Sequence, residues 1–313
     1  MYKVLLTCPP MIGLVDRFHD AFAQAGLEVT VPEFTQIVPE DRLIQIVPDY
    51  DGWIIGDDPA TRAVFEAGKA GRLKAAVKWG VGTDNVDFDA CKDLGLPITN
   101  TPGVFGREVG DLAMHYVLAL ARQTYEIDAG IRAGGWPKPS GISLWNKTAG
   151  VVGFGDIGRN TVKRLLAHDL EVTVFDPFAQ ADDLPEGVTL ETWPGVEDLD
   201  FLIFTAPLTP QTQHMFNKDV LARTKPGLRL VNVGRGPVVQ QAAVLDGLKS
   251  GHIHSAALDV FEVEPLAKDN PLHSYGMRCL FGSHNGSNTQ DAVTAVSLKA
   301  VGLLAGFLQA RPV

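Results

Sequence analysis

The sequence predicts two α/β domains, each built on a doubly wound parallel sheet. Its 313 residues are enough for about two domains of ordinary size. Short apolar runs alternate with helical stretches along nearly the whole chain, a pattern typical of parallel sheets covered by helices. Six such runs follow residue 147, which is the number of strands in one complete doubly wound sheet.

The composition is that of a globular protein whose partners are small molecules. Hydrophobic residues make up 45% of the chain and charged residues 20%. The net charge of −10 argues against nucleic acid, because binding phosphates requires clustered Lys and Arg. Three scattered cysteines suit neither a disulfide framework nor a zinc site, and no uncharged run approaches the length of a membrane span. We therefore expect a cytoplasmic protein with no metal, membrane or nucleic-acid partner.

Five apolar runs in the first hundred residues predict the strands of one open-sheet domain. Helical stretches at 15–25 and 60–68 lie between them. Residues 102–122 then predict a long, largely buried helix that joins the two domains. The five predicted strands occupy residues 4–7, 29–31, 53–56, 75–78 and 98–100.

A second series of strands begins after a polar loop. The tail at 291–308, rich in Ala, Val and Leu, predicts a last helix. The six predicted strands occupy residues 148–152, 172–175, 201–205, 229–233, 255–258 and 280–282.

A glycine-rich motif, GFGDIG, follows the first strand of this second series. Gly153 permits a tight turn, Gly155 lets the backbone approach a pyrophosphate, and Gly158 allows close packing of the helix that follows. The helix N-terminus offers unpaired N–H groups to the anion. Asp156 stands inside this loop, and we expect its side chain to point to solvent while its N–H faces the ligand.

An acidic residue at the end of the next strand indicates which dinucleotide binds. Asp176 lies 18 residues beyond Gly158, where a carboxylate accepts hydrogen bonds from both ribose hydroxyls. No Arg or Lys follows in residues 177–180 to hold a 2′-phosphate, so the motif favours NAD over NADP. The alternative is that Asp176 only caps the turn before Pro177.

Three polar residues follow the last three strands of this series. Arg235, Glu264 and His284 stand at the same sheet edge as the glycine loop, because parallel strands end together. A guanidinium holds a carboxylate and polarises a neighbouring carbonyl, and an imidazole paired with a carboxylate exchanges a proton near neutral pH. This set suits hydride transfer at a carbon that bears oxygen and adjoins a carboxylate. Taken singly, each residue could instead belong to an ordinary surface loop.

Seven segments, in order, resemble the motifs of the D-isomer-specific 2-hydroxyacid dehydrogenases. The resemblance covers almost the whole chain and is strongest to short members related to phosphoglycerate dehydrogenase. The segments are GVGTDNVD (80–87), NTPG (100–103), GFGDIG (153–158), APLTPQT (206–212), NVGRG (232–236), LDVFEVEP (258–265) and SHNG (283–286).

The resemblance implies an NAD-dependent enzyme that interconverts a small (R)-2-hydroxy acid and its 2-oxo acid. It implies a flavodoxin-like substrate domain, residues 1–100 with 287–313, and a Rossmann NAD-binding domain, residues 101–286, with a cleft between them. A homodimer built on the NAD-binding domain is also implied. The same family contains NADH-sensing corepressor-like proteins without significant turnover, which are the alternative function.

The resemblance also assigns residues to roles. Arg235, Glu264 and His284 correspond to the catalytic set, and Val81 and Gly82 help Arg235 hold the substrate carboxylate. Asp259 would lie near the carboxamide of NAD. The residues implied at the NAD site are Gly153, Gly155, Asp156, Ile157, Gly158, Asp176, Ala206, Pro207, Thr212, Val233, Gly234, Asp259 and Gly286.

One departure from the family pattern bears on the substrate. Phosphoglycerate-specific members tend to carry an Arg after the third strand of the substrate domain, where this chain has Gly-Asp-Asp-Pro at 56–59. Two acids there would repel a phosphate, although Lys78 and Arg62 lie nearby in sequence. Phosphoglycerate and an unphosphorylated acid of the glyoxylate, hydroxypyruvate or sugar-acid kind both stay open.

Overall fold

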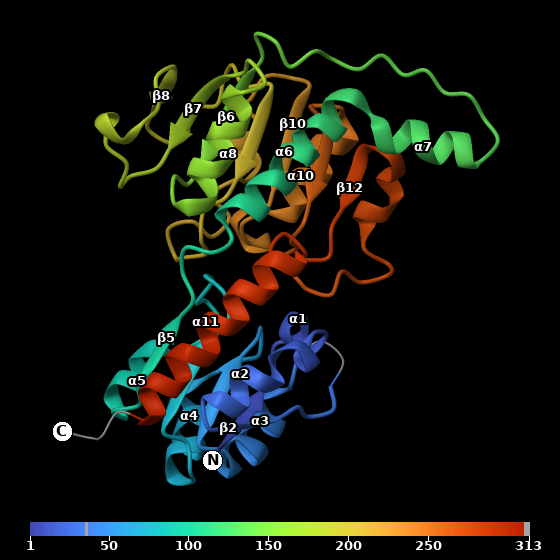
Figure 1. Ribbon diagram of the computed structural model, residues 1–313. Helices are drawn as coiled ribbons and strands as arrows, with labels where there is room; N and C mark the ends of the chain where they lie inside the picture. The colour runs from blue at the N-terminus through green and yellow to red at the C-terminus, as the bar shows by residue number, and fades with distance from the viewer. Residues whose placement is uncertain (35–36, 310–313) are drawn as a thin grey trace. The chain divides into compact units, whose positions relative to one another are not determined.

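The computed structural model describes residues 1–34 and 37–309, which form two compact units (Figure 1). The first unit comprises Met1–Val104 with Asn288–Val313, and the second comprises Phe105–Ser287. The sequence predicts the boundaries after residues 100 and 286, and the contacts divide the chain after residues 104 and 287. Each unit is an α/β layer structure with its own parallel sheet, as the alternating pattern predicts.

The first unit contains a five-stranded, all-parallel sheet in the order β2-β1-β3-β4-β5. This is the doubly wound order of flavodoxin-like folds. The central strands β3 and β4 are buried along their whole length because helices cover both faces. The strands are β1 (Tyr2–Leu6), β2 (Leu27–Thr30), β3 (Gly52–Ile55), β4 (Ala75–Lys78) and β5 (Ile98–Asn100).

The helix expected at 15–25 is divided in two. A 3₁₀ turn, η1 (Val15–Phe18), precedes α2 (His19–Gln24), because the backbone at Phe18 takes φ −108° and ψ 0°, outside the α-helical region, while its ring is buried. The remaining helical elements of this part are α1 (Pro9–Ile12), α3 (Glu40–Ile46), η2 (Val47–Asp49), α4 (Arg62–Ala70) and α5 (Phe88–Asp93).

The last helix, α11 (Gln290–Gln309), packs on the first sheet rather than on the second. Trp79 donates its indole N–H to Ser297 Oγ at 3.2 Å, and the side chains of Leu304 and Leu308 lie against Gly52 of β3. By length and composition alone, α11 is the one helix among the described residues that could cross a membrane. Its contacts with β3 and β4 account for its apolar character as core packing.

The second unit contains a seven-stranded, all-parallel sheet in the order β12-β11-β10-β9-β6-β7-β8. The sequence predicted six strands, so the prediction missed β8. This strand is three residues long, partly exposed and paired only with β7 at the edge, so it has no buried apolar run to reveal it. The strands are β6 (Thr148–Val152), β7 (Glu171–Phe175), β8 (Val188–Leu190), β9 (Phe201–Phe204), β10 (Leu228–Asn232), β11 (Ile253–Leu258) and β12 (Cys279–Phe281).

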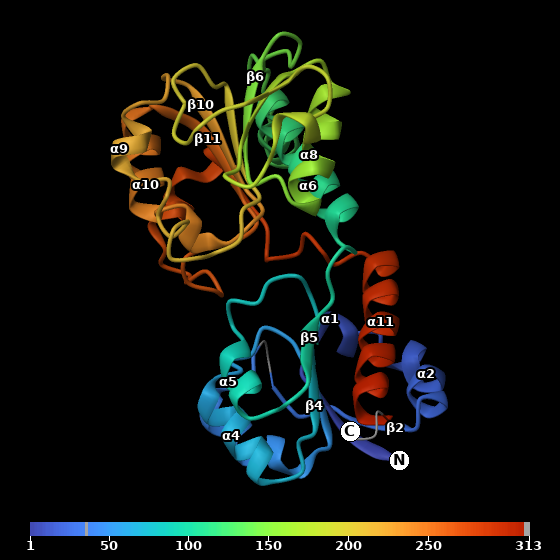
Figure 2. The same ribbon diagram turned by 90° about the vertical axis from the view of Figure 1, so that its left-hand side faces the viewer.

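Helices cover both faces of the second sheet (Figure 2). The long predicted helix is α6 (Gly106–Arg122), which packs with α8 on one face, while α9 and α10 lie on the other. Four aromatic rings, from Phe175 through Trp193 and Phe204 to Phe216, pack in successive edge-to-face pairs in the core. The other helical elements are α7 (Thr124–Arg132), α8 (Asp156–Leu166), η3 (Ala181–Asp183), α9 (Lys218–Leu221), η4 (Gly236–Val238), α10 (Gln241–Ser250) and η5 (Pro271–Arg278).

The strand order reverses direction within the second unit. The chain moves outward from β6 to β7 and β8 on one side, and after β8 it crosses back to β9 on the other side of β6. The loops after β6 and β9 therefore leave the sheet toward opposite faces, and ligands of open α/β sheets bind at the carboxyl ends of the strands where this reversal occurs.

Candidate active site

The glycine loop between β6 and α8 has the geometry that a pyrophosphate requires. Gly153 takes φ +94°, and a Cβ on it would lie 2.9 Å from the Ala206 backbone. A Cβ on Gly158 would lie 2.0 Å from the Gly153 carbonyl oxygen, so that position also requires glycine. Gly155 meets no atom within 4 Å, which leaves open space where the backbone can approach an anion. Helix α8 begins at Asp156 and directs its N-terminus at this loop.

The Asp176 carboxylate is bonded to two backbone N–H groups. Oδ2 accepts from Phe154 N in the glycine loop at 2.6 Å, and Oδ1 accepts from Phe178 N at 2.8 Å. The second bond is the turn cap before Pro177 that we considered as an alternative. Each oxygen retains further acceptor capacity, so capping the turn and accepting ribose hydroxyls are compatible. The ribose contact stays a prediction.

Asp156 is exposed, as expected, and its carboxylate also bonds to two neighbouring groups. Its Oδ2 accepts from Gly106 N, at the start of α6, at 3.0 Å, and its Oδ1 accepts from Asn160 Nδ2 at 3.2 Å. The positive end of the α6 dipole stabilises this exposed carboxylate. A negative charge next to a phosphate site is thereby partly compensated.

A histidine and a carboxylate from neighbouring strand ends form a close pair. His284, after β12, places Nδ1 2.8 Å from Oε2 of Glu264, after β11. The other oxygen of Glu264 accepts from Phe261 N at 2.9 Å, which fixes the carboxylate in place. Because Glu264 occupies Nδ1, proton exchange with a substrate falls to Nε2.

Asp259 anchors the loop that carries His284. The residue is buried, its Oδ1 accepts from Asn285 N at 3.1 Å, and its Oδ2 accepts from Gly286 N at 2.9 Å. Its carbonyl oxygen accepts from His284 N at 2.7 Å. These bonds hold His284 at φ +55°, a left-handed conformation that costs a non-glycine residue about 1–3 kcal/mol. The carboxamide contact implied for Asp259 stays a prediction.

Arg235 occupies a tight turn after β10. The Asn232 side chain shapes this turn, since its Nδ2 donates to Arg235 O at 3.0 Å and its Oδ1 accepts from Gly234 N at 3.1 Å. Arg235 Nη1 donates to Gly234 O at 3.0 Å. A Cβ on Gly236 would lie 1.8 Å from Phe261 O, so the Arg235 loop packs directly on the loop that carries Glu264.

The sequence did not assign roles to two of these residues. Asn232 is the first residue of the NVGRG motif. Its role in the turn could have been predicted, because Asn at a strand end commonly bonds to the backbone of the turn that follows. Tyr116 of α6 places its hydroxyl 3.4 Å from Asp259 Oδ1, a contact between segments far apart in the chain that no local pattern announces.

The other residues implied at the NAD site lie at the same edge of the sheet. Ala206 follows β9 and Val233 follows β10, and both are buried. A Cβ on Gly234 would lie 2.7 Å from Ala206 O. Thr212 donates to Pro207 O at 2.7 Å and so closes the loop after β9. Ile157 lies in the first turn of α8. Their contacts with NAD stay predictions.

Val81 and Gly82 belong to the first unit, where they follow β4. Asn100 Nδ2 donates to Val81 O at 3.1 Å, which ties the two strand ends together. Their contact with a substrate carboxylate stays a prediction. Within residues 1–34 and 37–309, no group of three or more His, Cys, Asp or Glu side chains could hold a metal ion.

Comparison with known proteins identifies the family. The NAD-binding-domain model of the D-isomer specific 2-hydroxyacid dehydrogenases matches residues 114–286. A hydroxypyruvate reductase of Thermotoga maritima is 34% identical over 280 residues, which are 88% of this chain and 89% of that protein. The chain belongs to the D-isomer-specific 2-hydroxyacid dehydrogenases. The D-3-phosphoglycerate dehydrogenase of Methanocaldococcus jannaschii is 32% identical over 302 residues, which are 94% of this dehydrogenase but 55% of the longer relative.

Solved structures agree with this membership. The TT0316 protein of Thermus thermophilus superposes with a TM-score of 0.87 at 29% identity and covers 99% of this dehydrogenase and 97% of that chain. The D-lactate dehydrogenase of Escherichia coli superposes with a TM-score of 0.83 at 26% identity over 97% and 96% of the two chains. The protein is thus an NAD-dependent oxidoreductase of 2-hydroxy and 2-oxo acids, and none of these relatives supports the corepressor alternative.

The residues of the second unit fit NAD and the chemistry of this family. Open space above Gly155, the α8 N-terminus and the Asp176 carboxylate are the features that hold a dinucleotide. When bound, NAD supplies or accepts the hydride. We assign to His284 the proton exchange with the substrate oxygen, to Glu264 the orientation of the imidazole, and to Arg235 the substrate carboxylate.

Replacing the proposed acid should separate catalysis from cofactor binding. We expect His284→Gln to bind NADH within about twofold of wild type and to lose about 10²- to 10⁴-fold in kcat, because it removes only the proton exchange. NADH fluorescence titration and steady-state rates with 2-oxo acids measure the two quantities. His168→Gln, on the opposite edge of the sheet, is the matched control. If kcat of His284→Gln stayed within tenfold of the wild-type value, His284 would not be the residue that exchanges the proton with the substrate.

Removing the carboxylate at the end of β7 should alter cofactor choice. In Asp176→Ala the ratio of kcat/KM with NADH to kcat/KM with NADPH should fall at least about tenfold, since a 2′-phosphate no longer meets a negative charge. The ratio cancels any loss that both cofactors share when the bond to Phe154 N disappears. Asp182→Ala, in the exposed turn η3, is the control. An unchanged ratio would show that Asp176 only caps its turn.

Proposed function

We propose that this dehydrogenase interconverts an unphosphorylated short 2-oxo acid, of the hydroxypyruvate or glyoxylate kind, and its (R)-2-hydroxy acid. The observation that carries the proposal is the charge balance at the carboxyl edge of the first sheet. There the segment 56–59 follows β3 and residues Val81 and Gly82 follow β4, so all of them stand at one edge.

The basic residue closest to this edge is already paired. Lys78, at the end of β4, donates from Nζ to Gly56 O at 2.5 Å and to Asp57 Oδ1 at 3.1 Å. Its side chain is 3% exposed, whereas that of Asp57 is 52% exposed. An incoming phosphate would therefore meet the Asp57 carboxylate first, with the lysine behind it, and like charges at short range disfavour binding.

The second basic residue is also engaged. Arg62 Nη2 lies 2.8 Å from Asp93 Oδ2, and its Nε lies 4.0 Å from Asp87 Oδ2. Asp58 contributes less to the repulsion than the sequence suggests, because it is buried and accepts from Val38 N at 2.8 Å and from Gly56 N at 3.2 Å. Burial raises the pKa of Asp58 above its ordinary value. Asp57 thus carries most of the repulsion.

The comparisons point the same way. The hydroxypyruvate reductase of Thermotoga maritima matches over 89% of its own length, whereas two phosphoglycerate dehydrogenases match over 55% and 44% of theirs. The relative that matches over nearly its whole length is thus one named for an unphosphorylated substrate, hydroxypyruvate.

A substrate panel tests the proposal. With NADH, we expect kcat/KM for hydroxypyruvate or glyoxylate to exceed that for 3-phosphohydroxypyruvate at least about tenfold, a difference of ~1.4 kcal/mol in transition-state binding. In Asp57→Asn the difference in kcat/KM between the unphosphorylated and the phosphorylated acid should be smaller, because the substitution removes the carboxylate that pairs with Lys78. Asp41→Asn, on the exposed side of α3, is the control. A higher kcat/KM for the phosphorylated acid in the wild type would overturn the proposal.

We propose further that the enzyme is a homodimer built on its second unit. Large apolar side chains stand exposed on α7 and on the long segment between α7 and β6, which runs along the outside of the unit (Figure 1). Trp136 and Trp145 are 77% and 67% exposed, and Ile131 is also exposed. Exposed apolar groups of this size favour a protein interface. Sedimentation equilibrium should give twice 33.7 kDa, and a mass of one chain would contradict the dimer.

For the cell compartment we propose the cytoplasm, with neither membrane nor nucleic acid as partner. The three cysteines are buried and free, as suits a reducing compartment, and the net charge of −10 disfavours nucleic acid. Cell fractionation followed by immunodetection tests the assignment, and recovery in the membrane fraction would refute it.

A further inference from the structure

A second histidine–carboxylate pair lies beside the catalytic one. His214, in the loop after β9, places Nε2 2.7 Å from Oε1 of Glu262, in the loop after β11. Glu262 Oε1 is shielded from solvent and has no hydrogen-bond partner among the described residues, so His214 approaches it without the alignment of a hydrogen bond. The imidazole of His214 is nevertheless the group that faces this carboxylate oxygen at short distance.

Each partner is tied closely to a catalytic residue. The backbone N–H of His214 donates to Pro237 O at 2.7 Å, two residues beyond Arg235. Glu262 stands two residues before Glu264, whose carboxylate holds His284. His214 therefore bridges the loop of Arg235 and the loop of Glu264.

The backbone of His214 shows that this bridge is held by its surroundings. His214 takes φ +51°, a left-handed conformation unfavourable for a residue with a side chain. The adjoining chain pairs with the Arg235 loop as well, since Phe216 N donates to Val238 O at 3.2 Å. The contacts to Pro237 and Glu262 thus hold the residue in a conformation that it would not adopt by itself.

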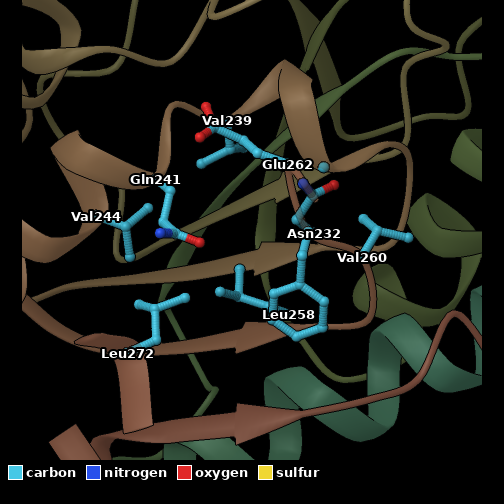
Figure 3. A pocket seen from close by; sticks show the side chains of 10 residues that line it. Asn232, Val239, Gln241, Val244, Leu258, Val260, Glu262 and Leu272 are labelled. Carbon is cyan, nitrogen blue, oxygen red and sulfur yellow. The ribbon is translucent and has the colours of Figure 1, made fainter. Parts of the chain in front are cut away.

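The Arg235 and Glu264 loops touch at Gly236, where a Cβ would lie 1.8 Å from Phe261 O. A pocket lies behind their contact, lined by Asn232 and Gly236 on one side and by Val260, Phe261 and Glu262 on the other. Figure 3 shows Glu262 and Val239 at one end of this pocket and Leu258 and Leu272 toward the other. It has room for about one water molecule. The backbone contact of Gly236 with Phe261 and the contact of His214 with Glu262 thus both link the two loops beside this pocket.

We propose that His214 and Glu262 are positioning residues that set the distance between Arg235 and the Glu264–His284 pair. Arg235 is assigned to the substrate carboxylate and His284 to the neighbouring oxygen, so their spacing must match one small molecule. The inference rests on the proposed function of these three residues. An ordinary surface pair would instead contribute little to stability and nothing to catalysis.

Truncating the bridge should reduce turnover without loss of fold or cofactor. In His214→Ala we expect kcat with the best 2-oxo acid to fall about 10- to 100-fold, as small misplacements of catalytic groups do. KM for NADH should change less than kcat, because the glycine loop and Asp176 are untouched and only Thr212 of the expected NAD site lies close to His214 in the chain. His214→Gln, which keeps an N–H donor for Glu262, should recover a large part of kcat. Adding Glu262→Ala to His214→Ala should cause little further loss, since paired residues are not additive.

His168→Ala is the matched control, because this histidine lies near the surface at the amino end of β7 and bonds only to Arg164 O among the contacts of its ring. Wild-type kcat in His214→Ala, or a loss in kcat that His214→Gln does not reduce, would overturn the inference.

Hydrogen exchange provides a readout that needs no turnover. Peptides covering residues 212–218 and 258–266 should exchange faster in His214→Ala than in wild type, while peptides from α8 and β7 should not change. If the wild type reduces none of the acids tested, the proposed function fails, and the exchange rates alone then decide the inference. Unchanged exchange in both peptides would overturn it.

Discussion

Parallel neighbours in the second sheet end along one edge, and the placement of every chemical group in this unit depends on that constraint. Along the edge, the order is Asp176 after β7, the glycine loop after β6, Arg235 after β10, Glu264 after β11 and His284 after β12. The dinucleotide-binding features therefore occupy one stretch of the edge and the acid–base residues the other. The reversal between β6 and β9 separates the two and opens the space that a nicotinamide needs.

The loops at this edge lie close together because their backbones touch at glycine residues. A Cβ would strike the backbone of the next loop at Gly153 and at Gly236, and at Gly158 it would strike the Gly153 carbonyl oxygen within the same loop. Glycine is thus required where neighbouring loops touch, and Gly155 differs because the space beside it is empty. The same residue type serves packing at three positions and ligand access at the fourth, a distinction that only the surroundings of each glycine reveal.

Buried and partly buried carboxylates determine how the catalytic groups face one another. Asp259 holds three successive N–H groups of the His284 loop, Glu264 holds the imidazole, and Glu262 meets His214 across the pocket rim. In the first unit the Asp57 carboxylate forms an ion pair with Lys78 instead. Carboxylates thus organise loops around the catalytic groups and pair with a lysine in the first unit, and this lysine pair supports our proposal of an unphosphorylated substrate.

The sequence by itself determined the class of each domain, the strands that are short, apolar and buried, the glycine loop and the family. These features depend on local composition and on spacing along the chain, which the fold does not alter. Tertiary structure decided the rest. The strand β8 escaped prediction because a half-exposed edge strand needs no apolar run, and one expected helix was split at the buried ring of Phe18. The partners of Asp156, Asp259 and Glu262 come from distant segments, because the direction of a side chain depends on which backbone groups the fold brings beside it.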